Sequence, residues 1–236
     1  MTDQRTRSVG EFDRLIELYL RKHLQKQPPG TLARWLGEPA EYSYAIRSVV
    51  EHEAARYFSG SALVRVELAE DILPTKLRGG GSVGVFAIRE GQAILLGAEH
   101  PEVVLGLLRD EGRLGDAPAV AVASLCCETL LAKRGHQSEV VTSVAEICEW
   151  YPEVRGYEIS PGTVSLLGER LHGPRWRTDD SGMNLEFFVL DSNFPNHQVR
   201  CIALGIPRDR DPACSEEVVV ERVFARTPVG RRGGYT

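Results

Sequence analysis

The chain has 236 residues, of which 42% are hydrophobic and 26% are charged, and its formal net charge is −5. This composition is typical of a globular protein with a sizeable core, and it excludes a disordered chain or a strongly basic nucleic-acid-binding domain. No apolar run approaches the roughly 20 residues that cross a bilayer, and the first ten residues lack the apolar centre of a signal peptide. We therefore expect a soluble cytoplasmic protein without membrane or nucleic-acid partners.

The N-terminal sixty residues predict helices. Apolar residues recur at helical spacing over residues 11–27, and Pro28-Pro29-Gly30 ends this stretch. Further helical patterns cover residues 31–36 and 41–58. We therefore expect a helical N-terminal section over residues 1–60.

Residues 61–229 predict a main domain with a mixed sheet. An alternating segment is followed by a hairpin around Arg89-Glu90-Gly91-Gln92, and then by a β-α-β-α rhythm that favours a locally parallel sheet. The C-terminal strands are expected to pair antiparallel, and residues 230–236 form a Gly- and Arg-rich tail. The predicted strands cover residues 62–68, 83–88, 93–96, 119–123, 139–144, 163–167, 184–190, 198–204 and 218–224, and the predicted helices cover residues 101–114, 124–134 and 145–150. The fold class is therefore α+β.

The cysteines predict reduced thiols. There are five, Cys126, Cys127, Cys148, Cys201 and Cys214, and none belongs to a CxxC pair. An odd number in a long chain without an export signal favours free thiols, and the missing CxxC pairs argue against structural zinc. We expect no bound metal and no cofactor.

The segment AVAVASLCCETLLAKRG, residues 119–135, suggests a nucleophile. If a buried strand led into a helix capped by Ser124, Cys126 and Cys127 would lie in the first helical turn, where the helix dipole lowers the pKa of a thiol. Strand-to-helix elbows often carry enzymatic nucleophiles. The alternative is that both cysteines are small core residues, as free cysteines usually are.

The stretch from Ile94 to Ser143 is similar in rhythm to the elbow region of DJ-1-like and class I amidotransferase folds. The part LLAKRGHQSEVVTSV is similar to the helix, turn and strand that follow the nucleophile of transglutaminase-like folds. Both resemblances imply cysteine-dependent chemistry. In each, the cysteine departs from the family's position.

His197 is the candidate general base. It lies in SNFPNHQVRCIAL at a predicted loop-to-strand junction, where a base for a thiol often enters, and Asp191 is near enough in sequence to orient it. The alternative is a loop histidine among solvated neighbours.

Two further patterns resemble binding motifs incompletely. His52-Glu53-Ala54-Ala55-Arg56 begins like the HExxH zinc helix but lacks the second histidine, so a solvated helix face is the better interpretation. The run GGGSVG, residues 79–84, fits GxGxxG, but it leads into a strand, so we interpret it as a loop connection or a mobile lid.

Arg175, Trp176 and Arg177 form the candidate ligand-binding cluster. Arginine outnumbers lysine by 24 to 4 in this chain, a bias typical of GC-rich bacterial genomes, and its guanidinium group makes bidentate contacts with carboxylates and phosphates. Together with the tryptophan ring, the two arginines could stack on a base or clamp an anion. The alternative is a surface loop with a half-buried tryptophan.

Two functions follow from these candidates. The first is a thiol-dependent acyl- or amide-transfer or hydrolysis enzyme for a small molecule or peptide, with Cys126 or Cys127 as nucleophile, His197 as base and Asp191 as its orienting group. The second is a non-enzymatic accessory module that binds a ligand beside Arg175–Arg177 and contacts a protein partner through its N-terminal helices. A fold class cannot choose between them.

Overall fold

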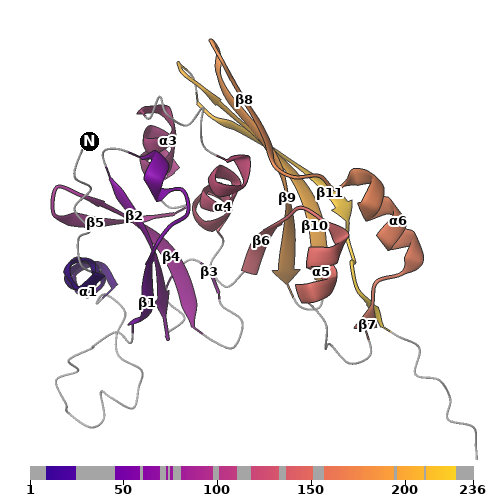
Figure 1. Ribbon diagram of the computed structural model, residues 1–236, viewed down its shortest axis with the longest axis horizontal. Helices are drawn as coiled ribbons and strands as arrows, with labels where there is room; N and C mark the ends of the chain where they lie inside the picture. Colours follow the sequence, from indigo (N-terminus) through magenta and orange to yellow (C-terminus); the bar gives the residue numbers. More distant parts are fainter. Residues whose placement is uncertain are drawn as a thin grey trace, which may run out of the picture. The chain divides into compact units, whose positions relative to one another are not determined.

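The computed structural model (Figure 1) confirms the α+β class, with five helices and two five-stranded antiparallel sheets in the part of the chain that it describes. The chain forms two compact units, Met1–Ala117 with Glu128–Gly135, and Pro118–Cys127 with His136–Thr236. The boundary predicted near residue 60 falls inside the first unit. The described residues are 9–24, 46–58, 61–69, 73, 75–76, 81–97, 101–110, 118–132, 137–150, 157–193, 196–209 and 211–226.

The first unit is built on a sheet with the strand order β1-β2-β4-β3, in which β5 also pairs with β4. Helix α1 packs on one face, where Ile16 and Leu20 are fully buried against Val64, Val66 and Phe86. Its apolar residues recur at helical spacing, as the sequence predicted. The elements of this unit are α1 (Val9–Leu24), β1 (Ile46–Glu51), the 3-10 helix η1 (Ala55–Tyr57), β2 (Ala62–Leu68), β3 (Thr75–Lys76), β4 (Ser82–Arg89), β5 (Gln92–Leu96) and α3 (Pro101–Asp110).

Strand β1 replaces part of the helix predicted over residues 41–58. It pairs antiparallel with β2, with Val49 opposite Val66 and Val50 opposite Arg65. The β-branched side chains of Val49 and Val50 favour a pleated strand, and the available edge of β2 satisfies the backbone of β1. Helical spacing over this short stretch was therefore a coincidence of composition.

The β4–β5 hairpin confirms the predicted turn. Glu90 and Gly91 both have positive φ angles, 51° and 76°. Positive φ at both central residues is the geometry of a two-residue type I′ turn, whose twist matches that of the flanking strands. The turn residues therefore fix the register in which Ile88 pairs with Ala93.

The second unit is built on a sheet with the order β11-β10-β9-β6, in which β8 also pairs with β9. Strands β8 and β6 share one edge of the long strand β9, β8 along Gly182 to Glu186 and β6 along Phe188 to Ser192. All of these pairs are antiparallel, so the predicted locally parallel sheet is wrong. The elements are α4 (Ala119–Thr129), which continues into the first unit at Glu128, β6 (Gln137–Val141), α5 (Val144–Trp150), β7 (Tyr157–Glu158), α6 (Pro161–Arg170), β8 (Arg175–Asp179), β9 (Gly182–Asn193), β10 (Asn196–Pro207), β11 (Ala213–Val220) and β12 (Ala225–Arg226).

Helices α4 and α6 both contain segments that were predicted as strands. Residues 119–123 alternate Ala and Val, but Ala is the best helix former, and the carbonyl of Pro118 accepts hydrogen bonds from the N–H groups of Ala121 and Val122. Residues 163–167 lie in α6, where the Ser160 side chain accepts a hydrogen bond from the Thr163 N–H. A serine cap followed by proline is a helix start signal that outweighs a short apolar alternation.

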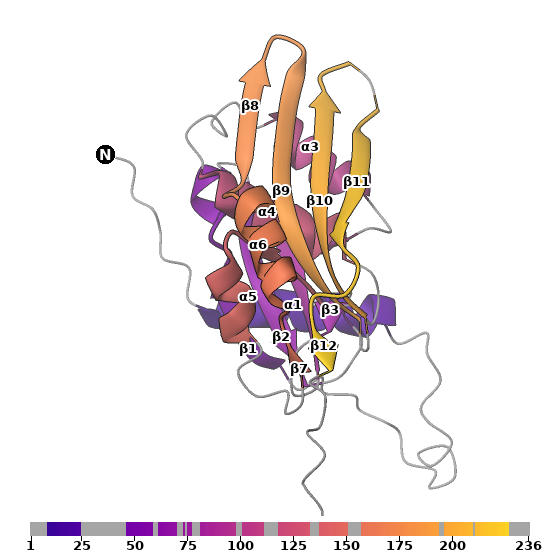
Figure 2. The same ribbon diagram turned by 90° about the vertical axis from the view of Figure 1, so that its right-hand side faces the viewer.

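Helices α5 and α6 cover only part of one sheet face. Ile147 of α5 and Leu167 of α6 are fully buried in a cluster with Phe188, Leu190 and Val199. Figure 2 shows α6 and α5 in front of the lower part of β9 and β10, while β8, β9, β10 and β11 continue upward side by side. The upper half of this face is therefore left without a covering helix among the described elements.

Several predictions fall outside the described residues: the helix end at 28–30, the helix at 31–36, the loop residues 79–80 and the tail at 230–236. None of the described helices has the length and apolar character that a membrane crossing requires.

Candidate functional site

The two candidate nucleophiles lie inside a helix and not at its start. Cys126 and Cys127 are buried in the second half of α4, and Ser124 is a mid-helix residue that caps nothing. Burial, followed by the nearby Cys214, raises the pKa of Cys126 to about 12, because a thiolate is poorly solvated there. Cys127 donates a hydrogen bond from Sγ to the Ser138 carbonyl, at 3.5 Å. The environment of Cys126 therefore favours the neutral thiol, and the Cys127 thiol is engaged by a backbone carbonyl.

Asp191 is part of a buried charge network. Its Oδ2 accepts a hydrogen bond from Arg200 at 3.0 Å, and its Oδ1 accepts one from Ser138 Oγ at 3.1 Å. Arg200 also donates to Glu216 at 2.5 Å. The Asp191 carboxylate is thus held between two strands, β6 and β10, and serves to neutralise a buried arginine.

His197 and Asp191 point to opposite faces of the sheet. Asp191 pairs directly with Gln198, so Asp191 and Arg200 share one face and His197 lies on the other. There the imidazole packs edge-to-face on Phe224, with ring centroids 5.2 Å apart. The structure therefore brings Asp191 toward Cys127 through Ser138, but it does not place His197 with them.

We expect iodoacetamide to alkylate Cys148 first and Cys214 more slowly in the folded protein at pH 8, and to leave Cys126 and Cys127 unmodified. Cys148 and Cys214 are exposed, and burial raises the pKa of Cys214, which slows its reaction. Cys126 and Cys127 are both buried, and the pKa of Cys126 is raised as well. Mass spectrometry of each cysteine, with and without denaturant, measures this. Fast labelling of Cys126 or Cys127 near pH 6 would instead support the enzymatic hypothesis.

His52 is buried, contrary to the predicted solvated helix face. It follows β1, and its Nδ1 accepts a hydrogen bond from the Ala54 N–H at 3.0 Å. Its Nε2 lies 3.9 Å from Glu128 Oε2, which in turn lies 3.3 Å from Arg65 Nε. Burial and then the charge of Arg65 lower the pKa of His52 to about 4, so at neutral pH this contact is not an ion pair.

The His52 cluster is not a metal site by its composition. Among the described residues, no three His, Cys, Asp or Glu side chains are grouped so that they could hold a metal ion.

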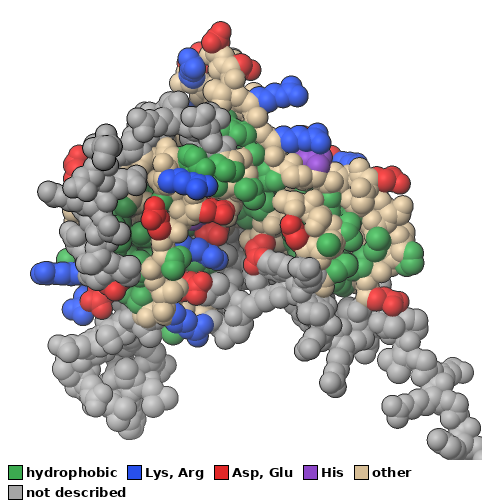
Figure 3. Space-filling model, viewed as in Figure 1, with side chains coloured by type: hydrophobic (Ala, Val, Ile, Leu, Met, Phe, Trp, Pro, Cys, Tyr) green, Lys and Arg blue, Asp and Glu red, His purple; other side chains and the backbone are tan. Residues whose placement is uncertain are grey.

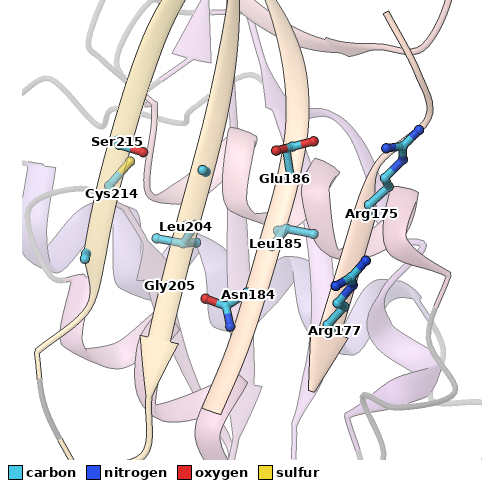
Figure 4. A pocket seen from close by; sticks show the side chains of 11 residues that line it. Arg175, Arg177, Asn184, Leu185, Glu186, Leu204, Gly205, Cys214 and Ser215 are labelled. Atoms are coloured by element: carbon cyan, nitrogen blue, oxygen red, sulfur yellow. The ribbon is translucent and has the colours of Figure 1, made fainter. Parts of the chain in front are cut away.

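A hollow of about 600 Å³ lies on the uncovered sheet face of the second unit. Two rows of directly paired residues line it, and paired residues point to the same side of a sheet. One row is Arg175, Glu186, Ala203 and Ser215, and the other is Arg177, Asn184, Gly205 and Ala213. Figure 4 shows the two guanidinium groups on the β8 side, Ser215 on the β11 side, and Asn184 and Glu186 between them.

The predicted Arg–Trp–Arg cluster is divided by the strand. Because successive side chains of β8 alternate, Arg175 and Arg177 face the hollow and Trp176 faces the opposite side. The two arginines lie roughly 7 Å apart along the strand, two residues at the usual rise. They therefore form a pair of cations along one border of the hollow.

No described residue supplies a counter-ion to these two arginines. The carboxylate of Glu186 is engaged by His172 at 3.1 Å, and that of Glu217 by Arg170 at 2.8 Å. Arg175 and Arg177 have no ion-pair or hydrogen-bond partner in the described part of the chain. In the space-filling view, Lys and Arg side chains project from the upper part of this unit, together with Asp and Glu side chains at its tip (Figure 3).

The comparisons with protein families, curated proteins and solved structures find no match. Asn184, Gly205 and Ser215 were missed by the sequence reasoning because they come from three separate strands. The available signal was Gly205, a glycine in the middle of an alternating strand pattern, since such a glycine often marks close approach by a ligand.

Proposed function

We propose that this protein is a non-enzymatic binding module that holds a small anionic ligand in the hollow between β8 and β11. The observation that carries the proposal is the pair Arg175 and Arg177, two cations on one face with no partner among the described residues. Guanidinium groups pair strongly with carboxylates and phosphates, often through two hydrogen bonds each. Glu186 contacts His172 and Glu217 is bonded to Arg170, so the charges of Arg175 and Arg177 are available to an external anion.

The thiol-dependent transfer reaction is the weaker proposal. It needs a thiolate and an imidazole within hydrogen-bond reach, but the pKa of Cys126 is raised and His197 lies on the other sheet face.

We further propose that the protein acts in the cytoplasm. That a protein partner binds the N-terminal helices stays a prediction. In α1, the side chain of Leu18 is 56% exposed and could contact such a partner.

We expect acetate and inorganic phosphate to shift the NMR signals of the Arg175 and Arg177 side chains, and Arg175→Gln or Arg177→Gln to weaken the binding. Hydrogen bonds to charged groups contribute about 1.5–3 kcal/mol, so each substitution should lower the affinity roughly 10- to 100-fold. Arg222→Gln is the matched control, because Arg222 is exposed and does not line the hollow.

Circular dichroism of each variant checks that the fold is kept. Affinities that are the same for Arg175→Gln, Arg177→Gln and Arg222→Gln would contradict the anion site.

A further inference from the structure

Gly205 has no backbone reason to be glycine. Its φ is not positive, and its pairing with Asn184 and Ala213 is regular. A Cβ built there would lie 3.4 Å from Asn184 Oδ1 and 3.8 Å from the Ala213 carbonyl oxygen, which is ordinary contact. Glycine in a strand interior weakens the strand because it has more conformational freedom and no side chain to pack. An alanine would therefore fit the fold at this position.

Gly182 does have a backbone reason to be glycine. Its φ is +143°, and a Cβ there would lie 2.3 Å from the Ile206 carbonyl oxygen, so the protein's own backbone excludes a side chain. A Cβ on Gly84 would lie 2.9 Å from Leu95 Cδ1, the end of a side chain that can move aside. At Gly205 the excluded volume lies in the hollow, so the natural explanation is close approach by a bound molecule.

Two of the residues next to Gly205 are also small. Ala203 and Ala213 are its neighbours on the same face, while Leu185 and Leu204 point to the opposite face by the alternation of their strands. The centre of the hollow is therefore a low floor of backbone and methyl groups. A helix from a partner would need large apolar side chains on this floor to pack against, and it has none.

We infer that the hollow binds a planar organic anion, whose ring lies flat on the floor of Ala203, Gly205 and Ala213 and whose acidic group pairs with Arg175 and Arg177. This inference rests on the proposed function, and it adds the shape of the ligand to its charge. A flat ring makes van der Waals contact with the whole floor, whereas a globular body of the same charge touches it at few points. Asn184, beside Gly205 and next to Arg177, offers an amide donor to the acidic group.

The test compares three carboxylates by NMR titration: 2-naphthoate, which is planar, adamantane-1-carboxylate, which is globular, and acetate, which has no ring. We expect 2-naphthoate to bind most tightly and to shift the amide signals of β9 and β10. Gly205→Val should reduce the affinity for 2-naphthoate to the level of acetate and leave acetate binding unchanged. Gly205→Ala serves as the smaller variant if Val disturbs the sheet, and Gly168→Ala, whose Cβ would meet nothing within 4 Å, is the matched control.

Two outcomes separate the inference from the proposed function. The planar-ligand inference would be overturned by equal affinities for 2-naphthoate and adamantane-1-carboxylate, or by an unchanged 2-naphthoate affinity in both Gly205 variants. The proposed anion site would still stand in that case if acetate binding depended on Arg175 and Arg177. No arginine-dependent binding of any of the three carboxylates would overturn both.

Discussion

Replacing Asp191 by alanine is expected to lower the free energy of unfolding by about 3 kcal/mol. The substitution removes a carboxylate 3.0 Å from Arg200, whose side chain is only 8% exposed. Losing one partner of a buried ion pair leaves the other charge poorly solvated, and such losses lie at about 3–5 kcal/mol. We expect the lower end of this range, because Glu216 still accepts a hydrogen bond from Arg200.

Urea denaturation of the variant and the wild-type protein measures this loss. The control is the double variant Asp191→Ala with Arg200→Met, which also removes the buried charge left without its partner. It should be more stable than the single Asp191→Ala variant. If the free energy of unfolding of the Asp191→Ala variant lay within about 1 kcal/mol of the wild-type value, the buried charge of Arg200 would not need Asp191 as its partner.

The wild-type protein is expected to lose about 3 kcal/mol more stability between pH 7 and pH 4 than a His52→Asn variant does. The pKa of His52 is lowered from 6.5 to about 4 in the folded protein, so below pH 6.5 the unfolded chain takes up a proton that the folded chain does not. Proton uptake by the unfolded state favours unfolding, and a shift of this size corresponds to about 3 kcal/mol once the pH has fallen to 4. The loss is therefore confined to the window from pH 6.5 down to 4.

Asparagine is the matched replacement because its side-chain oxygen can accept the hydrogen bond that the Ala54 N–H donates to His52 Nδ1. Glu128 acts in the opposite direction, since burial raises its pKa and the folded state then binds its proton first. Both proteins keep Glu128, so the part of its contribution that does not depend on His52 cancels in the difference. Parallel stability curves for the two proteins over this pH range would contradict the buried, neutral His52.

The sequence predicted the elements whose signals are local. The apolar spacing of α1, the alternation of β2 and the turn residues Glu90 and Gly91 each act within one element. It did not predict β1, where the edge of β2 decides the structure of a segment with mixed signals. In α4 and α6, the prediction followed a short alternation of apolar residues, whereas the structure follows the helix starts at Pro118 and Ser160.

The candidate site was predicted only in part, for the same physical reason. Arg175 and Arg177 are close in sequence and were found together, but Trp176 was grouped with them because the alternation of a strand was not recognised there. Gly205 and Ser215 reach the same face only through the registers of two hairpins. A register is set by pairing across strands, so no single segment carries it.

The shared edge of β9 has a consequence for the order of folding. Strands β8, β9, β10 and β11 follow one another along the chain, so each pair forms through a short connection, whereas β6 reaches the same edge of β9 only after α5, β7 and α6. The bond between Arg200 and Asp191 spans nine residues and that between Ser138 and Asp191 spans 53. Long loops close more slowly and at a greater loss of chain entropy. The four-stranded meander that carries the hollow should therefore assemble early, and the addition of β6 should be the late step that completes the sheet.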